Sequence, residues 1–163
     1  MQSLKDVYIH QLQDLHSANK QALKAVRNLV NAAASDNLKR ALERGVSGIE
    51  DGTGKLETLI RAHDADPDGA HCKGMEGLVR EARSHALKEE FDDDAVRDAV
   101  IITQYQRMAH YAIAGYGCAA AFAKQLGLPN EAQTLSGMLD AAHSGDETMS
   151  DIAEQKVNQR AAL

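Results

Sequence analysis

The 163-residue chain is 44% hydrophobic but only 4% aromatic, lacks tryptophan and carries a net charge of −6. This length suits one domain, and a core built from Leu, Ile, Val, Ala and Met favours packed helices over sheets. The acidic balance argues against a nucleic-acid-binding module, and no apolar run approaches the roughly 18 residues that a membrane-spanning helix needs.

The first predicted helix covers approximately residues 3–31. Ser3 and Asp6 form a weak capping-box start. Asn19 is the polar exception on the apolar face of this helix. The apolar positions recur in steps of three and four, as one face of a helix requires: Leu4, Tyr8, Leu12, Leu15, Ala22, Val26 and Leu29.

The second predicted helix begins after Ser35, a plausible N-cap, and contains an unusual concentration of glycine. Gly45, Gly48, Gly52 and Gly54 all lie in its middle. Each interior glycine costs a helix about 0.8–1 kcal/mol relative to alanine. Two interpretations follow: a weakened or kinked helix, or a place where another backbone or a ligand comes close.

A turn-rich segment at residues 63–73 separates this helix from a short one at residues 74–90. The acidic run at residues 92–94 suits the N-terminus of the next helix, residues 95–126, because negative charge complements the helix dipole there.

Gly127 and Pro129 mark the end of that helix and the start of the last one, residues 129–159. Four long helices and one short helix joined by short connections predict an all-α, antiparallel four-helix bundle. We expect residues 1–163 to form this single domain.

Five strings, in this order, resemble the YciE/YciF family of ferritin-like bacterial proteins: VYIHQLQDLHSANKQ (7–21), CKGMEGL (72–78), VRDAVII (96–102), HYAIAGYG (110–117) and AKQLG (123–127). The resemblance covers nearly the whole chain. It implies a ferritin-like bundle with one additional short helix, a homodimer, and an association with bacterial stress responses.

Ferritin-like bundles hold two metal ions with inward-facing Glu and Glu-x-x-His side chains. The resemblance implies that Asn19 stands in place of one glutamate, and that Ala109 and Ala112 replace two more acids. Ser47 and Gly48 stand where another glutamate is expected.

On the last helix the usual acidic cluster becomes Asp140-Ala-Ala-His143, with Asp146 further along. We therefore predict no di-metal site and no cofactor. A single weak metal site using His and Asp stays open as an alternative.

Replacing carboxylates by small side chains leaves the bundle centre either collapsed or hollow. If it is hollow, a small-molecule ligand is a candidate occupant. The residues expected to line such a cavity are Ser47, Gly48, Glu50, Ala109, Ala112, Tyr116 and Ala142. We interpret Tyr105 and Tyr116 chiefly as packing aromatics.

The candidate catalytic residues are His16, Asn19, His110, His143 and Asp146. A histidine near its ordinary pKa suits proton transfer at neutral pH. The pairs that we weigh are His16 with Asn19, Asp146 with Glu50, and a surface hydrogen bond between His143 and Asp146. His110 lies one position off the Ala109 stripe, which favours a surface or interface role.

Three functions compete on this evidence. The first is a metal-free protein with a stress-associated binding or structural role and no ferroxidase activity. The second is a repurposed metal-independent enzyme that eliminates, isomerises or hydrates a small molecule by acid–base chemistry. The third, residual metal-dependent oxidation, lacks its ligands. Cys72 and Cys118 do not have the spacing of a metal or redox pair and no signal peptide is visible, so we expect a cytoplasmic protein.

Overall fold

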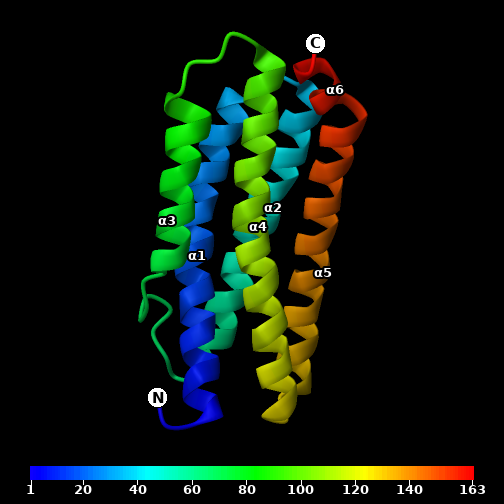
Figure 1. Cartoon of the computed structure of the whole chain (residues 1–163). Coiled ribbons are helices and arrows are strands. Elements are labelled where there is room, and N and C mark those ends of the chain that lie inside the picture. The colour runs from blue at the N-terminus through cyan, green and yellow to red at the C-terminus, as the bar shows by residue number, and fades with distance from the viewer.

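The computed structural model describes residues 1–163, and every regular element is a helix (Figure 1). The α-helices are α1 (Leu4–Ala32), α2 (Asp36–Arg61), α3 (Lys73–Ala82), α4 (Asp94–Gln125), α5 (Pro129–Ile152) and α6 (Asn158–Ala161). Two π-helical turns, η1 (Arg83–Lys88) and η2 (Ala153–Val157), follow α3 and α5. The predicted all-α fold is confirmed.

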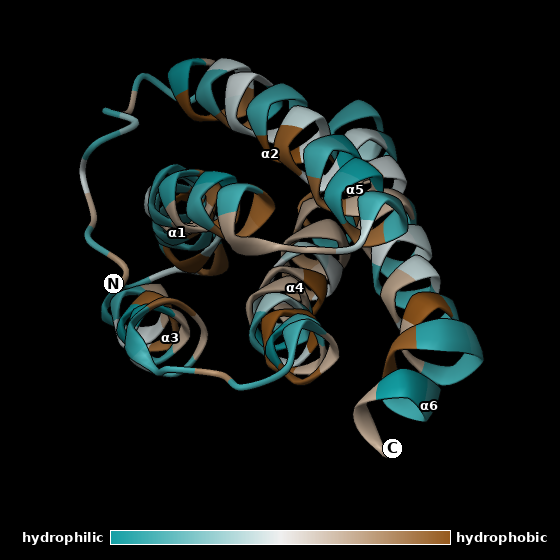
Figure 2. Cartoon of the chain, turned by 90° about the horizontal axis from the view of Figure 1, so that it is seen from above, coloured by the Kyte–Doolittle hydropathy of each residue, from teal (hydrophilic) through white to brown (hydrophobic).

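Helices α1, α2, α4 and α5 form the antiparallel bundle, and α3 lies outside it against α1 and α4 (Figure 2). The most extensive contacts are those of α4 with α5 and of α1 with α2. The bundle therefore consists of two helical hairpins packed together. No helix is both long enough and apolar enough to cross a membrane.

The helix starts follow the predicted capping residues with one correction. The Ser3 and Asp6 capping box forms at the start of α1, and Asp93 accepts backbone hydrogen bonds at the start of α4. Ser35 occupies the N-cap of α2, but its side chain makes no capping bond. Instead, the backbone N–H groups of Ala34 and Ser35 each donate to the buried Asp98 carboxylate at 2.8 Å. Asp98 thereby ties the turn between α1 and α2 to α4.

Helix α2 is continuous through all of its glycines. At Gly45 an added Cβ would lie 2.7 Å from the Tyr105 hydroxyl oxygen, and at Gly52 it would lie 3.3 Å from the Asn19 amide nitrogen. Gly48 and Gly54 face open space instead. Close approach is thus the reason for glycine at two of these positions, and an unfilled space accompanies a third, Gly48.

Two predicted helices differ from the structure at their C-terminal ends. The helix predicted at residues 74–90 is α-helical only to Ala82 and continues as a π-helical turn to Lys88. The last helix likewise changes to a π-helical turn at Ala153 before the short α6. Gly127, with a φ of 72°, ends the α4 segment as predicted.

Two buried clusters make up the core. One contains Tyr8, Leu12, Leu15, Leu56 and Leu135 near the turn between α4 and α5, and the larger one lies toward the opposite end of the bundle. The candidate site lies between the hairpins where these clusters meet.

Candidate functional site

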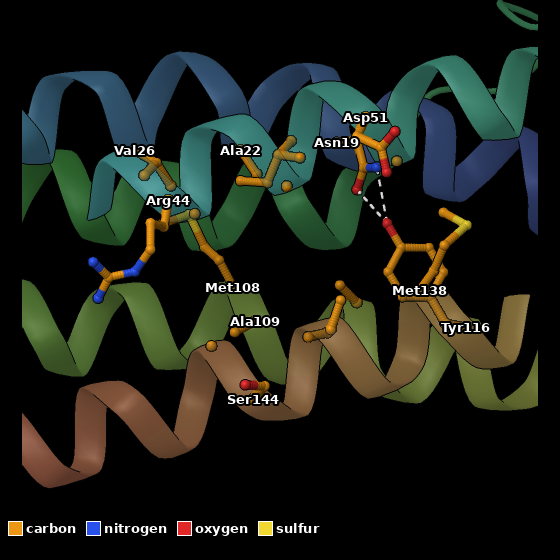
Figure 3. Close-up of a pocket in the computed structure, with 18 of the residues that line it drawn as sticks. Asn19, Ala22, Val26, Arg44, Asp51, Met108, Ala109, Tyr116, Met138 and Ser144 are labelled. Atoms are coloured by element: carbon orange, nitrogen blue, oxygen red, sulfur yellow. Dashed lines mark hydrogen bonds between the residues drawn. The ribbon is translucent and has the colours of Figure 1, made fainter. Parts of the chain in front are cut away.

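A cavity of about 310 Å³ opens between α2 and α5, and its floor is formed by the other helices (Figure 3). This volume lies at the lower end of the range for small-molecule sites. The α2 and α5 lining includes Ala41, Arg44, Gly45, Gly48, Asp51, Gly52, Lys55, Gly137, Met138, Ala141, Ala142, Ser144, Gly145 and Thr148; the floor includes Asn19, Ala22, Val26, Met75, Tyr105, Met108, Ala109, Ala112 and Tyr116. The bundle centre is therefore hollow.

Small side chains produce this space. Gly48, Ala109, Ala112 and Ala142 all line the cavity, as does Tyr116. The remaining lining is mainly apolar and includes three methionines, Met75, Met108 and Met138. Methionine side chains are flexible and polarizable, so these walls can adapt to more than one ligand shape.

Ser47 and Glu50 do not line the cavity, contrary to the expectation from the sequence. Ser47 precedes Gly48 by one residue and Glu50 follows it by two. Because a helix has 3.6 residues per turn, both side chains point away from the face of α2 that carries Gly48. Ser47 is exposed, and its hydroxyl donates to the Glu43 carbonyl at 3.3 Å. Glu50 pairs with Arg27 on the surface.

Asn19 and Tyr116 form the polar end of the cavity. The Asn19 Nδ2 donates to the Tyr116 hydroxyl at 2.9 Å, and the hydroxyl oxygen lies 3.1 Å from Oδ1 of the same amide. Burial raises the pKa of Tyr116 to about 12, and the contact with Asn19 opposes that shift. The amide that the sequence placed among the catalytic candidates is therefore engaged by a neutral phenol.

Tyr105 is the polar group that the sequence did not single out. Only 8% of this residue is exposed, and it lines the cavity. Its hydroxyl lies opposite Gly45 and Gly145, and no hydrogen-bond partner is present. Burial, aided by the nearby Asp146 charge, raises the pKa of Tyr105, so the hydroxyl stays protonated at neutral pH. Only the glycines that face it, Gly45 on α2 and Gly145 on α5, could have indicated this position.

The mouth of the cavity carries charged side chains. Asp51 forms an ion pair of 2.6 Å with Lys55 on the same helix. Arg44 lies at the end of the cavity opposite the Asn19 and Tyr116 pair (Figure 3), and no carboxylate pairs with it.

His16 is buried but belongs to a different place. Its Nε2 lies 3.1 Å from Glu57 Oε1, and its Nδ1 lies 3.7 Å from Asp68 Oδ1. Although His16 and Asn19 share a helix, they have different partners, and His16 does not line the cavity. The predicted His16 and Asn19 pair is therefore not formed.

His110 and Asp146 form a surface pair between α4 and α5. The His110 Nε2 lies 3.0 Å from Asp146 Oδ2, and 63% of the histidine side chain is exposed. Neither residue lines the cavity. Asp146 therefore pairs with His110 rather than with His143 or Glu50. His143 is exposed.

The donor atoms in the centre do not fit the two metal ions of a ferritin-like site. The only carboxylate in the lining is Asp51, which is already paired with Lys55. The other polar groups are the amide of Asn19, two phenols with raised pKa values, two hydroxyls (Ser144 and Thr148) and two cations (Arg44 and Lys55), none of which is a usual ligand for these metals. Nowhere in residues 1–163 do three or more His, Cys, Asp or Glu side chains gather as a metal-ligand set.

Comparison with known proteins places the whole chain in one family. A family profile described as a domain of unknown function, DUF892, matches residues 3–162. The chain belongs to the DUF892 family. Protein YciF of Escherichia coli K12 is 32% identical over 165 residues, which cover 99% of this DUF892 chain and 96% of YciF.

Two solved structures share the DUF892 chain's fold. The crystal structure of the E. coli stress protein YciF superimposes with a TM-score of 0.89 and 31% identity, covering 97% of this chain and 99% of that one. YcfI from Rhodopseudomonas palustris gives a TM-score of 0.86 and 26% identity, covering 92% and 94%. The predicted resemblance to the YciE/YciF family is confirmed.

Proposed function

We propose that this DUF892 protein is a stress-associated binding protein that holds a small organic molecule in its central cavity, without metal and without ferroxidase activity. One observation carries the proposal: a mostly apolar cavity of about 310 Å³ opens at the surface, and the unpartnered Tyr105 hydroxyl points into it. Apolar walls with a few placed polar groups are typical of ligand sites.

The small residues on both sides of the opening support the proposal that the cavity is already open in the absence of a ligand. Gly45 and Gly48 on α2 face Gly137, Ala141 and Ser144 on α5 across the mouth. Small residues at these positions leave a gap between the two helices, so a ligand does not have to displace packed core residues. A preformed site binds at a smaller cost in ordering.

The stress association rests on the relative. E. coli YciF is described as a stress protein, and it matches this chain over nearly its full length. A cytoplasmic location and a homodimeric state are further parts of the proposal. Free thiols at Cys72 and Cys118 support the first, and the family resemblance supports the second.

The geometry favours binding over acid–base catalysis. Two of the candidate catalytic histidines, His16 and His110, have carboxylate partners. Both lie outside the cavity lining. Among the groups that do line it, Asn19 and Tyr116 are bonded to each other, and Asp51 is paired with Lys55. Metal-dependent oxidation lacks a fitting set of donor atoms.

A matched pair of glycine substitutions tests the proposal. Gly48 and Gly54 both lie on α2 with nothing within 4 Å of an added Cβ, but only Gly48 lines the cavity. With N-phenyl-1-naphthylamine as a neutral fluorescent probe, the parent and Gly54→Leu should bind alike. Gly48→Leu, and Ala109→Leu on the floor, should weaken binding roughly tenfold or more, about 1.4 kcal/mol. Circular dichroism and thermal melts confirm folding.

Equal binding by the Gly48→Leu and Gly54→Leu proteins would remove the cavity from the proposal. The metal-free part has its own test: the purified protein is mixed with Fe(II) in air, and oxidation is followed against a protein-free control. A rate above that control that depends on the protein would contradict the absence of ferroxidase activity.

A further inference from the structure

A second groove, with an excess of cationic side chains, adjoins the central cavity. This groove has a volume of about 280 Å³ and runs along α2, the end of α5 and η2. Arg44 and Thr148 line both spaces, so the groove and the cavity meet at these two residues. A ligand with two chemically different ends could therefore place one end in each.

The groove and the cavity differ sharply in chemistry. Arg40, Arg44 and Lys156 line the groove together with a single carboxylate, Asp151. None of the three cations takes part in an ion pair; Arg40 donates only to the Asn37 amide. The protein as a whole has a net charge of −6, so this concentration of unpaired positive charge is local.

Tyr105 supplies a second, independent indication of a ligand near this junction. Its hydroxyl lies opposite Gly45, the residue next to Arg44, and it has no partner in the protein. More than nine-tenths of the residue is buried. The hydroxyl itself stays accessible from the cavity, so a ligand atom that accepts its hydrogen bond can reach it directly.

Building on the function proposed above, we propose that the ligand is an amphipathic anion. Its apolar chain occupies the cavity among Met75, Met108 and Met138. Its carboxylate or phosphate head lies at the groove end, paired with Arg44 and its neighbouring cations, and accepts a hydrogen bond from Tyr105.

The parts of this assignment agree physically. Guanidinium groups bind carboxylate and phosphate through paired charge-assisted hydrogen bonds, and they do so better than they bind neutral heads. An apolar chain gains free energy on leaving water for the cavity, and flexible methionines tolerate variation in its shape. The cationic groove alone would select any anion, and the apolar cavity alone would select any apolar molecule. Together they favour a molecule with an anionic head and an apolar chain.

Titration calorimetry on the full chain tests the assignment with decanoate, decyl phosphate and neutral 1-decanol, each below its micelle concentration. The two anions should bind at least about tenfold more tightly than the alcohol, a difference of about 1.4 kcal/mol. Added salt should weaken the anions and leave the alcohol unchanged. Whichever anion binds more tightly identifies the preferred head. Inorganic phosphate or acetate binding as tightly would overturn the need for an apolar chain.

A charge-matched pair of variants locates the head. Combining Arg40→Gln, Arg44→Gln and Lys156→Gln should abolish the preference for the anions, so that decanoate, decyl phosphate and 1-decanol bind this variant with similar affinity. The control combines Lys24→Gln, Lys88→Gln and Lys124→Gln, three exposed lysines without ion pairs elsewhere on the surface. The control should retain anion binding. An equal loss in both would overturn the inference.

Tyr105→Phe tests the hydrogen bond to the head. It removes the hydroxyl and keeps the ring, so we expect roughly tenfold weaker anion binding with an unchanged fold. Unchanged anion affinity in this variant would exclude Tyr105 from the site.

The outcomes separate this inference from the proposed function. Tight 1-decanol binding with no preference for the anions would overturn the anionic head and leave the cavity as a binding site. Anion binding that survives Gly48→Leu unchanged would confine the ligand to the surface groove and overturn the amphipathic assignment. No binding of any alkyl compound or of the naphthylamine probe would contradict both proposals.

Discussion

The Asn19 amide lies 2.9 Å from the Tyr116 hydroxyl and joins α1 to α4 in the bundle centre. The family resemblance in the sequence leads us to expect that Asn19 replaces a metal-binding glutamate. Here a neutral amide and a neutral phenol satisfy each other instead, and both are buried. This pair holds one end of the cavity open without any charge.

Tyr116→Phe should therefore destabilise the protein by about 1–3 kcal/mol, because it leaves the buried Asn19 amide without its partner. Urea unfolding measures the change. Adding Asn19→Leu should recover part of the loss, since both polar groups are then gone. A double variant as unstable as the sum of its single variants would argue against a direct interaction.

The raised tyrosine pKa values predict a loss of stability in alkali. The pKa of Tyr116 is raised to about 12, so the unfolded chain releases this proton near pH 10 whereas the folded chain retains it. Between these values the unfolded state binds fewer protons, and the free energy of unfolding falls as the pH rises. The contribution of Tyr116 alone is on the order of 2–3 kcal/mol. Denaturant titrations at pH 8, 10 and 11 measure the part of this loss, about half, that falls below pH 11.

Burial also raises the pKa values of Tyr8, Tyr105 and Tyr111, so their losses add to that of Tyr116. Comparison with Tyr116→Phe separates this residue from them and from lysine deprotonation. The variant should lose less stability than the parent between pH 10 and 11. Parallel pH profiles for the two proteins would contradict the buried phenol as a cause.

Asp98 is expected to be the most sensitive carboxylate for stability. Its two oxygens accept hydrogen bonds from the backbone N–H groups of Ala34 and Ser35, and only 3% of the residue is exposed. Asp98→Ala should cost about 2–4 kcal/mol in urea unfolding, because it leaves two donors without their charged acceptor.

The exposed Asp94, which pairs only with Arg97, provides the control for Asp98. Asp94→Ala should change stability by less than about 1 kcal/mol. Similar effects at the two positions would show that the turn does not depend on Asp98.

The glycines divide into positions that need glycine and positions that do not. Gly54→Ala should stabilise the protein by about 0.5–1 kcal/mol, since the added methyl meets nothing and helix propensity improves. Gly115→Ala should destabilise it by about 1–3 kcal/mol, because the methyl would overlap the fully buried Leu15 side chain. Thermal melts distinguish the two; shifts in the same direction would contradict this division.

The sequence could predict the helices because their signals are local. The apolar periodicity of α1, the Ser3 capping box and the stop at Gly127 each depend on neighbouring residues alone. The substitution of small residues for acids at Ala109 and Ala112 also pointed to an altered bundle centre, and both residues line the cavity.

The partners of the polar side chains could not be predicted in the same way. Whether His16 meets Glu57 depends on how α1 is rotated against α2, and one residue of helix changes the direction of a side chain by about 100°. The same applies to Asp146, which meets His110 across α4 and α5. The positions of Tyr105 and Arg44 in the cavity lining could not be predicted, because the cavity opens between α2 and α5, two helices that are distant in sequence.

The cavity also determines how the bundle responds to hydrostatic pressure. Unfolding eliminates internal space, so compression favours the unfolded chain in proportion to the void that the folded chain contains. The space of about 310 Å³ between the two hairpins opens at the surface, so only the part of it that excludes water counts toward this void. A molecule that filled that part would remove the void and so reduce the destabilisation by pressure.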